Sequence, residues 1–289
     1  MISKHSLERM LSVFVSIVVL STVCARASDD SIDSIIKRGV NAGDRAVITV
    51  DGVEYAFRWA PPGTFIMGAS KDGSGEVGGD VDFGVFHKVT LTKGFWILET
   101  ETTQKMWTAV VGENPSEFQD ECKPVDSVSF DDVLLFCEKL SQSARLPEGT
   151  AFGLPTEAQW EYAARAGKTE LLSVEELDKV AWYGDRDYNG THKVAMKEAN
   201  DWGLYDMLGN LWEWTADKIG KIATDEDGNG LDAVDPTGAT DEETPANLRV
   251  DRGGCWDSYD YECSFAYRGY YSGDRKGPYV GFRFVYIPK

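Results

Sequence analysis

Two cysteines near the end of the chain are the residues whose chemistry most needs an explanation. Cys255 follows directly after Arg252-Gly253-Gly254, and Cys263 lies eight residues further on. No two cysteines of the chain have CxxC spacing, which argues against a zinc ribbon or a thioredoxin-type site. The cysteines beyond the N-terminal region are Cys122, Cys137, Cys255 and Cys263, which allow three disulfide pairings. Cys255 and Cys263 can therefore form a disulfide or remain two unpaired buried thiols.

The segment around these cysteines is rich in aromatic residues that alternate with Ser, Asp and Gly. Rigid rings beside small, adaptable polar side chains are typical of surfaces that bind other molecules. The candidates for ligand contact are Trp256, Tyr259, Tyr261, Tyr267, Tyr270 and Tyr271. In the alternative interpretation, half or more of the rings pack into the C-terminal core, which suits Trp256 and Phe282.

A short acidic segment is a candidate calcium loop. Asp225, Asp227 and Asn229 fall at positions 1, 3 and 5 of an EF-hand-type pattern, with Gly230 at position 6. Position 12 is Pro236, so the bidentate glutamate of that pattern is missing. The incomplete pattern favours a solvated acidic loop over a weak calcium site.

Strand signals are clearest in the first third of the chain. Apolar alternation on both sides of Asp51-Gly52 predicts a hairpin formed by Val47–Val50 and Val53–Trp59. Residues 70–86 are rich in Gly and Asp and are predicted to form a loop, and Val89–Leu98 is predicted to be one strand.

Helix signals come from N-cap residues followed by an apolar face. The predicted helices start at the caps Thr103, Ser129 and Thr156, and the first and third end at Gly112 and Gly167. A short helix is also expected over Ser31–Lys37. After residue 170 there is little periodicity. The mixture of elements predicts an α+β domain with much irregular backbone.

Residues 1–27 have the composition of a secretory signal peptide. Lys4 and Arg9 precede the uncharged run Leu11–Val23, and Ala25-Arg26-Ala27 offers a small-x-small cleavage site. The run is too short to cross a bilayer as a helix, although a short N-terminal anchor is an alternative. We expect a linker or short helix over residues 28–44, a folded domain over 45–289, and a secreted, periplasmic or cell-surface protein without a stable membrane span.

Charge and motif content argue against several functional classes. The formal net charge of −19 repels phosphate backbones, so a nucleic-acid partner is not expected. Only His87 and His192 follow the predicted signal peptide, which argues against a His-rich catalytic metal centre. The sequence contains no P-loop, no Rossmann glycine pattern, no Gly-x-Ser-x-Gly and no His-Glu-x-x-His.

Six segments, taken in order, resemble the formylglycine-generating enzyme (sulfatase-modifying factor) family. They are Gly63–Gly68, Pro124–Cys137, Gly153–Arg165, Gly203–Trp214, Arg249–Gly254 and Gly281–Arg283. Any one of them is weak by itself, whereas six in the family order are highly specific. The resemblance implies an α+β, C-type-lectin-like fold of the formylglycine-generating-enzyme type, low in regular secondary structure.

The resemblance also implies a chemistry. Oxidases of the family use oxygen and copper to convert a sulfatase cysteine to formylglycine, and two cysteines five residues apart hold Cu(I). In this chain the first position is Ser258 and the second is Cys263. A serine hydroxyl does not replace a thiolate as a ligand for Cu(I), and Cys255 reaches Cys263 only if the loop is rebuilt. We therefore expect a non-oxidase member that binds a peptide, glycan or protein ligand, with a copper-dependent oxidase as the alternative.

A calcium site is the other implication of the resemblance. Carried over by position, its ligands are Asp206, the carbonyls of Gly209 and Leu211, and Glu213. All four supply oxygen donors, as a hard cation requires. In the alternative interpretation, the same carboxylates form a network that braces the turn.

Overall fold

The computed structural model describes most of the chain beyond the predicted signal peptide. The described residues are 39–69, 84–184, 189–228, 230–238 and 246–288. The predicted signal peptide, the predicted helix Ser31–Lys37, residues 70–83 of the predicted loop and Asn229 lie outside them. Within the described residues, no helix combines the length and the apolar character needed to cross a membrane.

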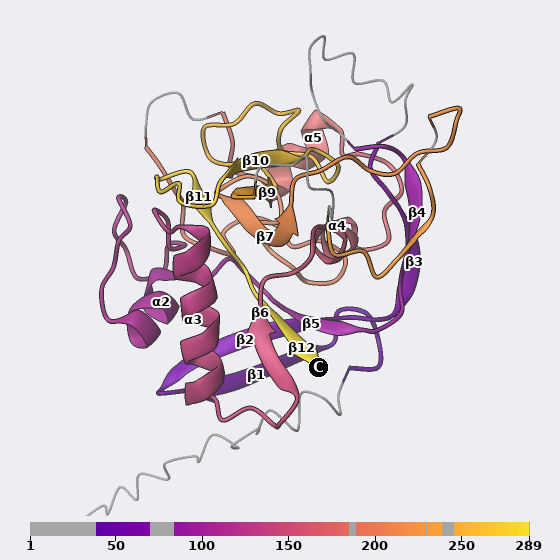
Figure 1. The fold of residues 1–289 in the computed structure, drawn as a ribbon. Helices are drawn as coiled ribbons and strands as arrows, with labels where there is room; N and C mark the ends of the chain where they lie inside the picture. Colours follow the sequence, from indigo (N-terminus) through magenta and orange to yellow (C-terminus); the bar gives the residue numbers. More distant parts are fainter. Residues whose placement is uncertain (1–38, 70–83, 185–188, 229, 239–245, 289) are drawn as a thin grey trace, which may run out of the picture.

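A five-stranded sheet joins the two ends of the domain. Its strands lie in the order β1 (Arg45–Val50), β2 (Val53–Ala60), β5 (Phe95–Leu98), β12 (Val285–Pro288) and β6 (Thr150–Gly153). The predicted hairpin is confirmed: β1 and β2 pair antiparallel, and Asp51 and Gly52 both have positive φ, 49° and 79°. Positive φ at both central residues is the requirement of a type I′ turn. The last strand, β12, lies between β5 and β6, so the C-terminus is built into this sheet (Figure 1).

Three predicted helices are confirmed together with their caps. They are α2 (Gln104–Val111), α3 (Phe130–Ser143) and α4 (Glu157–Arg165). Thr103 accepts a hydrogen bond from the Met106 N–H, and Ser129 and Thr156 each form a complete capping box. A fourth helix, α5 (Val174–Val180), was not predicted, although Ser173 and Glu176 form a capping box there too.

The prediction of one strand over Val89–Leu98 is wrong. The segment contains β4 (His87–Leu91) and β5, which belong to different sheets. Between them, the N–H and hydroxyl of Thr92 donate to the Asp235 carboxylate over 2.8 and 2.5 Å. A Cβ at Gly94 would lie 2.3 Å from the Trp59 ring, so the chain passes this ring only with a glycine. These two long-range contacts break the strand and redirect the chain.

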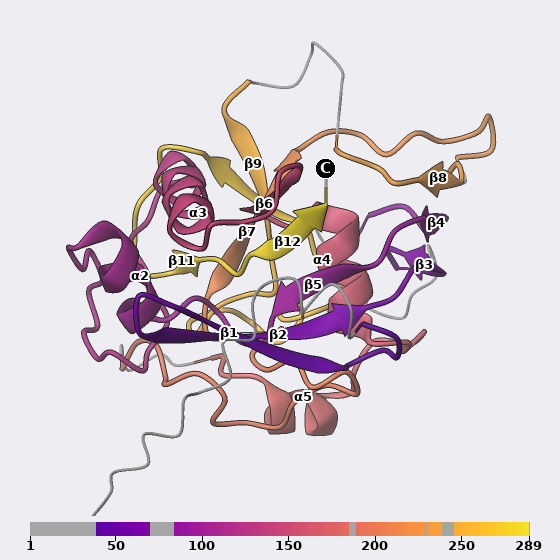
Figure 2. The same ribbon diagram turned by 90° about the horizontal axis from the view of Figure 1, so that it is seen from below.

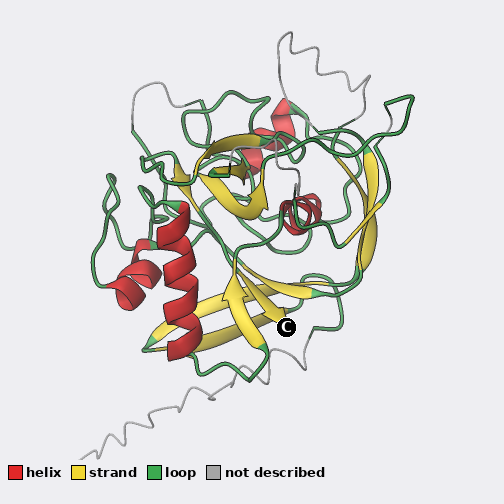
Figure 3. Cartoon of the chain, viewed as in Figure 1, coloured by secondary structure: helices red, strands yellow, loops and turns green. Residues whose placement is uncertain are grey.

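Two smaller sheets complete the molecule. One has the order β3 (Gly63–Met67), β4 and β8 (Ala233–Val234), and the other has the order β10 (Gly269–Ser272), β9 (Leu248–Arg252), β7 (Trp212–Lys218) and β11 (Val280–Gly281). Figure 2 shows β3, β4 and β8 together at one side of the molecule. Long loops surround the four-stranded sheet, as Figure 3 shows. The architecture is therefore α+β with little regular secondary structure, as predicted.

Two apolar clusters form the core. One is centred on Phe284, which is fully buried and contacts the rings of Phe57, Phe136 and Phe152 at centroid distances of 5.2 to 5.8 Å. The other surrounds Trp160 of α4, which is also fully buried. The two clusters hold α3 and α4 against the sheets, and they fix the positions of the loops between β7 and β12.

Candidate functional site

A buried arginine lies at the centre of the segment predicted to bind calcium. The Arg283 guanidinium is completely buried and donates from Nε to both oxygens of the Glu213 carboxylate, over 2.9 and 2.8 Å. Its Nη2 donates to Glu213 Oε1 over 2.7 Å and to the carbonyl oxygens of Tyr205 and Asp206 over 2.8 and 3.0 Å. Trp160 Nε1 donates to Glu213 Oε2 over 2.7 Å. Arg283 and Trp160 therefore satisfy the Glu213 carboxylate.

Local strand geometry brings these two residues together. β11 runs parallel to β7, with Val280 paired to Trp212 and Gly281 paired to Glu213. Beyond β11 the side chains alternate in environment: Phe282 and Phe284 lie in the aromatic core, whereas Arg283 between them faces the carboxylates. The segment Gly281-Phe282-Arg283 therefore places one charged side chain within an otherwise apolar layer.

Two further carboxyl groups share this site. Glu101 accepts hydrogen bonds from Asn210 Nδ2 over 2.6 Å and from the Leu211 N–H over 3.0 Å. Burial, together with the charges of Asp206 and Glu213, raises the pKa of Glu101 well above its ordinary value. Burial also raises the pKa of Asp206 to about 6. One Asp206 oxygen accepts from the Ala195 N–H over 2.7 Å, and the other, Oδ1, is buried without a partner. Burial therefore disfavours the charged forms of Glu101 and Asp206, whereas Glu213 is held directly by Arg283.

The four positions carried over as calcium ligands lie together at this site, and Arg283 holds one of the predicted donors, the Glu213 carboxylate. From Asp206 it holds the backbone carbonyl, whereas the predicted donor is the side chain, whose Oδ1 is buried without a partner. The N–H groups of Gly209 and Leu211 donate to the Gly253 carbonyl and to Glu101 Oε1, and these bonds do not involve the carbonyl oxygens that are the predicted ligands. No group of three His, Cys, Asp or Glu side chains in the described part of the chain is arranged to hold a metal ion. The predicted ligand set has only two such side chains beside two backbone carbonyls, so this finding does not test it, and the calcium site and the bracing carboxylate network both stay predictions.

The acidic loop that is the second candidate calcium site is described only in part. Asp225 and Asp227 are exposed, and the Asp227 N–H donates to Asp225 Oδ1 over 3.0 Å within the turn. Asn229, the third candidate ligand, is not among the described residues. The weak calcium site at this loop also stays a prediction.

A second buried ionic network ties α4 to β9. Arg252 donates from Nη1 to Glu157 Oε1 over 2.6 Å and from Nη2 to Glu161 Oε2 over 2.5 Å. Arg268 donates to both oxygens of Glu157, and Arg165 donates to Glu161. Burial opposes ionisation of Glu157, but the charges of Arg268 and Arg252 outweigh it and lower the pKa of Glu157 to about 2. The network fixes the strand that leads directly into Gly253-Gly254-Cys255.

The two cysteines lie in the core and do not face an open groove. Cys255 is 4% exposed, with its sulfur 3.6 Å from Ser258 Oγ, and Cys263 is 3% exposed. A Cβ at Gly254 would lie 2.5 Å from the Cys263 sulfur, so this loop closes tightly over it. All four cysteines of the described chain are free thiols. The sequence allows Cys255 and Cys263 to form a disulfide or to stay unpaired, and in the structure they are two unpaired buried thiols.

Burial also controls the ionisation of these thiols. It raises the pKa of Cys255 to about 11 and that of Cys263 well above its ordinary value. Both groups are therefore protonated at neutral pH. The thiolate is the form that binds metals and attacks substrates, and reactive cysteines are usually partly exposed with a lowered pKa. Cys255 and Cys263 are instead buried, and their pKa values are raised.

The aromatic candidates differ in exposure: Trp256 is buried, Tyr261, Tyr267 and Tyr271 are half-buried, and Tyr259 and Tyr270 are exposed. Trp256 is completely buried, stacks on Tyr279 and donates from Nε1 to the Pro278 carbonyl. Its assignment to the ligand surface is therefore wrong, because no ligand can reach its ring. Tyr259 is 53% exposed and stacks on Tyr261 at a centroid distance of 5.5 Å, and Tyr261 contacts Tyr267 at 6.1 Å.

The two tyrosines of β10 point in opposite directions. Side chains alternate along a strand, so Tyr270 and Tyr271 lie on opposite sides of β10. Tyr271 packs against the same apolar cluster as Tyr267 and carries the Arg275 guanidinium 3.4 Å above its ring centre. Tyr270, 52% exposed, lies on the other side. We define the tyrosine face by the four remaining candidates, Tyr259, Tyr261, Tyr267 and Tyr271.

Acidic residues are interleaved with the tyrosine face. The Tyr259 N–H donates to Glu262 Oε2 over 2.7 Å, and the Tyr261 N–H donates to Asp260 Oδ1 over 2.9 Å. Burial, with a smaller effect from the Glu262 charge, raises the pKa of Tyr267 to about 12. The face therefore combines fixed rings with negative charge on a loop held by its own hydrogen bonds.

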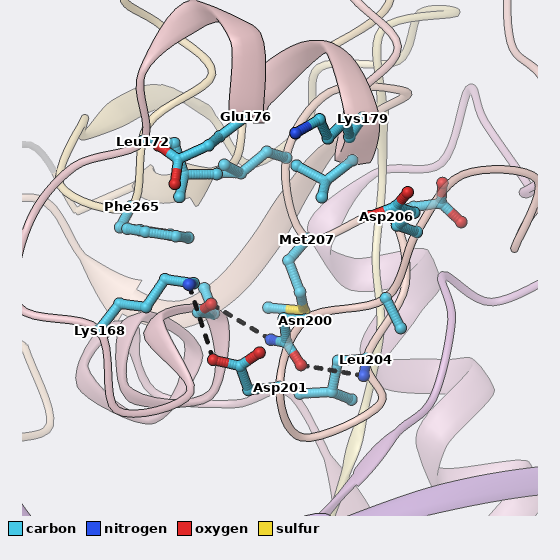
Figure 4. A pocket seen from close by; sticks show the side chains of 15 residues that line it. Lys168, Leu172, Glu176, Lys179, Asn200, Asp201, Leu204, Asp206, Met207 and Phe265 are labelled. Carbon is cyan, nitrogen blue, oxygen red and sulfur yellow. Dashed lines mark hydrogen bonds and ion pairs between the residues drawn. The ribbon is translucent and has the colours of Figure 1, made fainter.

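A pocket of about 220 Å³ lies near this segment, between α5 and the turn that precedes Asp206 (Figure 4). Phe265 and Met207 supply apolar wall, while Lys168 and Asp201 pair over 3.6 Å at its edge. The pocket was not predicted from the sequence because α5, which forms one side of it, was not predicted. The Ser173 and Glu176 capping box was the signal that could have revealed it.

Comparisons with known proteins identify relatives of this chain. Residues 56–287 match the sequence model described as the sulfatase-modifying factor enzyme 1-like domain. The chain is 28% identical to the chaperone protein LppX of Paenibacillus barcinonensis, over 68% of this chain and 81% of that protein. It is also 28% identical to the formylglycine-generating enzyme of Mus musculus, over 61% of this chain but only 48% of the enzyme. The solved structure of Treponema denticola variable protein 1 superposes with a TM-score of 0.72 at 27% identity, covering 85% of this chain and 99% of that one.

The Arg283–Glu213 pair gives a first prediction. Replacing Arg283→Met leaves a buried carboxylate without its counter-ion, so we expect the free energy of unfolding to fall by about 3–5 kcal/mol. Adding Glu213→Gln should restore a large part of this loss, because the uncompensated charge is removed. Chemical denaturation measures both effects. Arg45→Met, which removes a half-exposed partner of Glu99, is the control and should cost about 1 kcal/mol or less. An Arg283→Met loss no greater than that of the control would contradict this role.

The calcium prediction has a direct test. A calcium ion held by Asp206, Glu213 and the two carbonyls would stabilise the fold, since a ligand of the native state raises stability. The predicted site therefore requires a melting temperature that rises in millimolar CaCl₂ and falls again in EGTA. The same melting temperature in both would contradict calcium binding and favour the carboxylate network, in which Arg283 holds Glu213.

Proposed function

The chain belongs to the family of sulfatase-modifying factor enzyme 1-like domains, and on this basis we propose that it is a non-oxidase member that binds a peptide or protein ligand. Its fold is the expected C-type-lectin-like fold of the formylglycine-generating-enzyme type. The relatives include a chaperone protein as well as a formylglycine-generating enzyme, so membership by itself leaves the activity open. The observation that carries the proposal is the burial of both candidate thiols beside a tyrosine face in which Tyr259 is exposed and the other three rings are half-buried.

The state of the thiols argues against the family's oxidation. Copper binding would need two thiolates at one accessible place, because a soft Cu(I) ion is selected by sulfur ligands. Here Ser258 occupies the first family position and is itself 4% exposed, while Cys263 lies beneath Gly254. A substrate cysteine could not approach either sulfur without opening this loop. The residues at this position therefore do not fit a copper site.

The tyrosine face supports recognition of a ligand instead. Large rings with few rotatable bonds bury much area at low entropic cost, and they are enriched among the residues that dominate binding energy. Asp260 and Glu262 beside Tyr259 and Tyr261 favour a partner that carries Lys or Arg, whose cationic groups can also lie over the rings. The ligand class that these features favour is a peptide or protein segment with basic side chains.

We place this function outside the cytoplasm. The basic start, apolar run and small-x-small site within residues 1–27 support export, since this arrangement is that of a signal peptide. A ligand-binding surface on an exported domain would meet extracellular, periplasmic or cell-surface partners.

The proposed ligand surface can be tested with a displayed library of random 12-residue peptides. We expect selection on the wild-type protein to enrich peptides that contain Lys or Arg. Tyr259→Ala should weaken binding of the enriched peptides by about tenfold or more, as for an exposed aromatic residue at the centre of an interface. Fluorescence anisotropy with labelled peptides measures the affinities.

The chain offers a matched control for this experiment. Tyr270 is equally exposed and lies in the same segment, but on the opposite side of β10. Tyr270→Ala should leave the affinities unchanged within about twofold. An equal loss of peptide affinity in both variants, or the absence of any enriched peptide, would refute the assignment of the tyrosine face as the ligand surface. Binding to a glycan array that depends on Tyr259, without peptide binding, would refute the choice of ligand class.

The oxidase alternative can be tested separately. The protein is incubated with Cu(I), oxygen and a peptide that contains the sulfatase cysteine motif, and aldehyde formation is measured by mass spectrometry. We expect no aldehyde above the level given by Cys263→Ser, because the buried thiols do not form an accessible copper site. Aldehyde formed by the wild type and lost in Cys263→Ser would overturn the non-oxidase proposal.

A further inference from the structure

The pocket beside α5 has an apolar interior. Its volume of about 220 Å³ is larger than that of an apolar cavity of roughly 150 Å³ that holds a benzene-sized molecule. In Figure 4, Phe265 and Met207 lie in the middle of the pocket, with the residues of α5 on one side and with Lys168 and Asp201 on the other. The other large apolar lining residues are Leu172, Val180, Leu204 and Leu208. The pocket therefore has room for one large apolar group.

Hydrogen bonds fix the walls of this pocket. The Asn200 side chain donates from Nδ2 to the Ala163 and Ala164 carbonyls of α4 over 2.9 and 3.2 Å, and its Oδ1 accepts from two N–H groups of the following turn. The Glu198 N–H donates to the Lys179 carbonyl over 3.1 Å. The same loop is thus tied to α4 and to α5. A preformed pocket lowers the entropic cost of binding a ligand.

The charges of the pocket lie at its rim. Lys168 pairs with Asp201 over 3.6 Å, and Asp206, which also lines the pocket, is 3% exposed and belongs to the Arg283 site. Burying an ion among the apolar side chains would be unfavourable, so the interior suits an uncharged group. The exposed charged residues of the rim are two basic and three acidic ones: Lys168, Lys179, Glu176, Glu198 and Asp201. The acidic excess suits a ligand whose other groups are basic.

The pocket adjoins the tyrosine face. Phe265 lies two residues before Tyr267, so the Cα atoms of the two residues are at most about 7 Å apart. The Gly184 N–H, shortly after the end of α5, donates to the Ser258 carbonyl over 3.0 Å. This bond ties the α5 side of the pocket to the residue directly before the tyrosine face. A peptide that lies on the tyrosine face can therefore also reach the pocket.

We propose that the peptide ligand of the tyrosine face places one large apolar side chain, of the size of Leu, Met or Phe, in this pocket. The inference rests on the proposed binding function and adds a second anchor to it. The basic side chains of the ligand contact the tyrosine face and the acidic rim, while the apolar side chain packs against Phe265, Met207 and Leu172. Burial of such a side chain is sufficient to change an affinity by about tenfold or more.

Affinities of matched peptides and protein variants test this anchor. Peptides enriched from the 12-residue library should contain Leu, Met or Phe as well as Lys or Arg. Replacing that apolar peptide residue by Ala should weaken binding to the wild-type protein by about tenfold or more. Leu172→Asp puts a charge into the pocket wall and should cause a similar loss. In this variant the original peptide and its Ala version should bind alike within about twofold, because the two changes remove one shared contact.

The neighbouring leucine supplies a matched control. Leu171 is 40% exposed and is not among the residues that line the pocket. Leu171→Asp introduces the same charge one residue away, and peptide affinities should stay within about twofold of those of the wild type.

A single blocked amino acid separates the pocket from the tyrosine face. Ligand-observed NMR should detect binding of N-acetyl-phenylalaninamide to the wild type and to Tyr259→Ala, and no binding of N-acetyl-alaninamide. Ala199 is half-buried and lines the pocket, so Ala199→Trp should fill it and abolish this signal. This second variant keeps the test valid if Leu172→Asp does not fold.

The outcomes distinguish this anchor from the proposed binding function. If Tyr259→Ala weakens peptide binding but the apolar peptide residue and Leu172→Asp have no effect, the anchor is overturned and the binding function stands. An absent N-acetyl-phenylalaninamide signal, or an unchanged signal in folded Ala199→Trp, would overturn the anchor as well. Peptides that depend on Leu172 but not on Tyr259 would overturn the tyrosine face as the ligand surface, and with it the two-point anchoring.

Discussion

The structure depends on two completely buried arginines and the carboxylates that they hold. Arg283 pairs with a glutamate 70 positions away in the sequence, and Arg252 with one 95 positions away. A buried charge without a partner is strongly unfavourable, so each pair permits only one arrangement of the segments that it joins. This constraint explains how a molecule with so much loop holds a defined shape. The long loops of Figure 3 are anchored at buried charges as well as by the apolar core.

The same anchoring decides what the C-terminal segment can do. Arg252 fixes the strand that enters Gly253-Gly254, and the tight turn that follows closes over the sulfur of Cys263. Burial keeps the thiols protonated and inaccessible, while the polypeptide between them exposes Tyr259, which stacks on half-buried Tyr261. A scaffold that places its cysteines in the core and its tyrosines on the surface is suited to binding. The oxidation chemistry of related enzymes would need the opposite arrangement.

Local signals in the sequence predicted the local structure well. The Asp51-Gly52 turn and the caps Thr103, Ser129 and Thr156 depend on neighbouring residues alone, and all of them are confirmed. The break between β4 and β5 could not be predicted because it depends on Asp235 and Trp59, which are distant in the sequence. The arginine–glutamate pairs escaped prediction for the same reason. By contrast, the α5 capping box and the opposite directions of Tyr270 and Tyr271 follow from short-range rules, and both were within reach of the sequence.

Thiol labelling of the native protein tests the central claim, a closed thiol site, most directly. Iodoacetamide is added at pH 8, and labelling at each cysteine is followed by mass spectrometry. Exposed Cys122 serves as the positive internal control, and buried Cys137 serves as the negative one. We expect Cys122 to react rapidly, and Cys255 and Cys263 to stay as protected as Cys137 until the protein is unfolded. Labelling of Cys255 or Cys263 as rapid as that of Cys122 would mean that the thiol site is open and reactive.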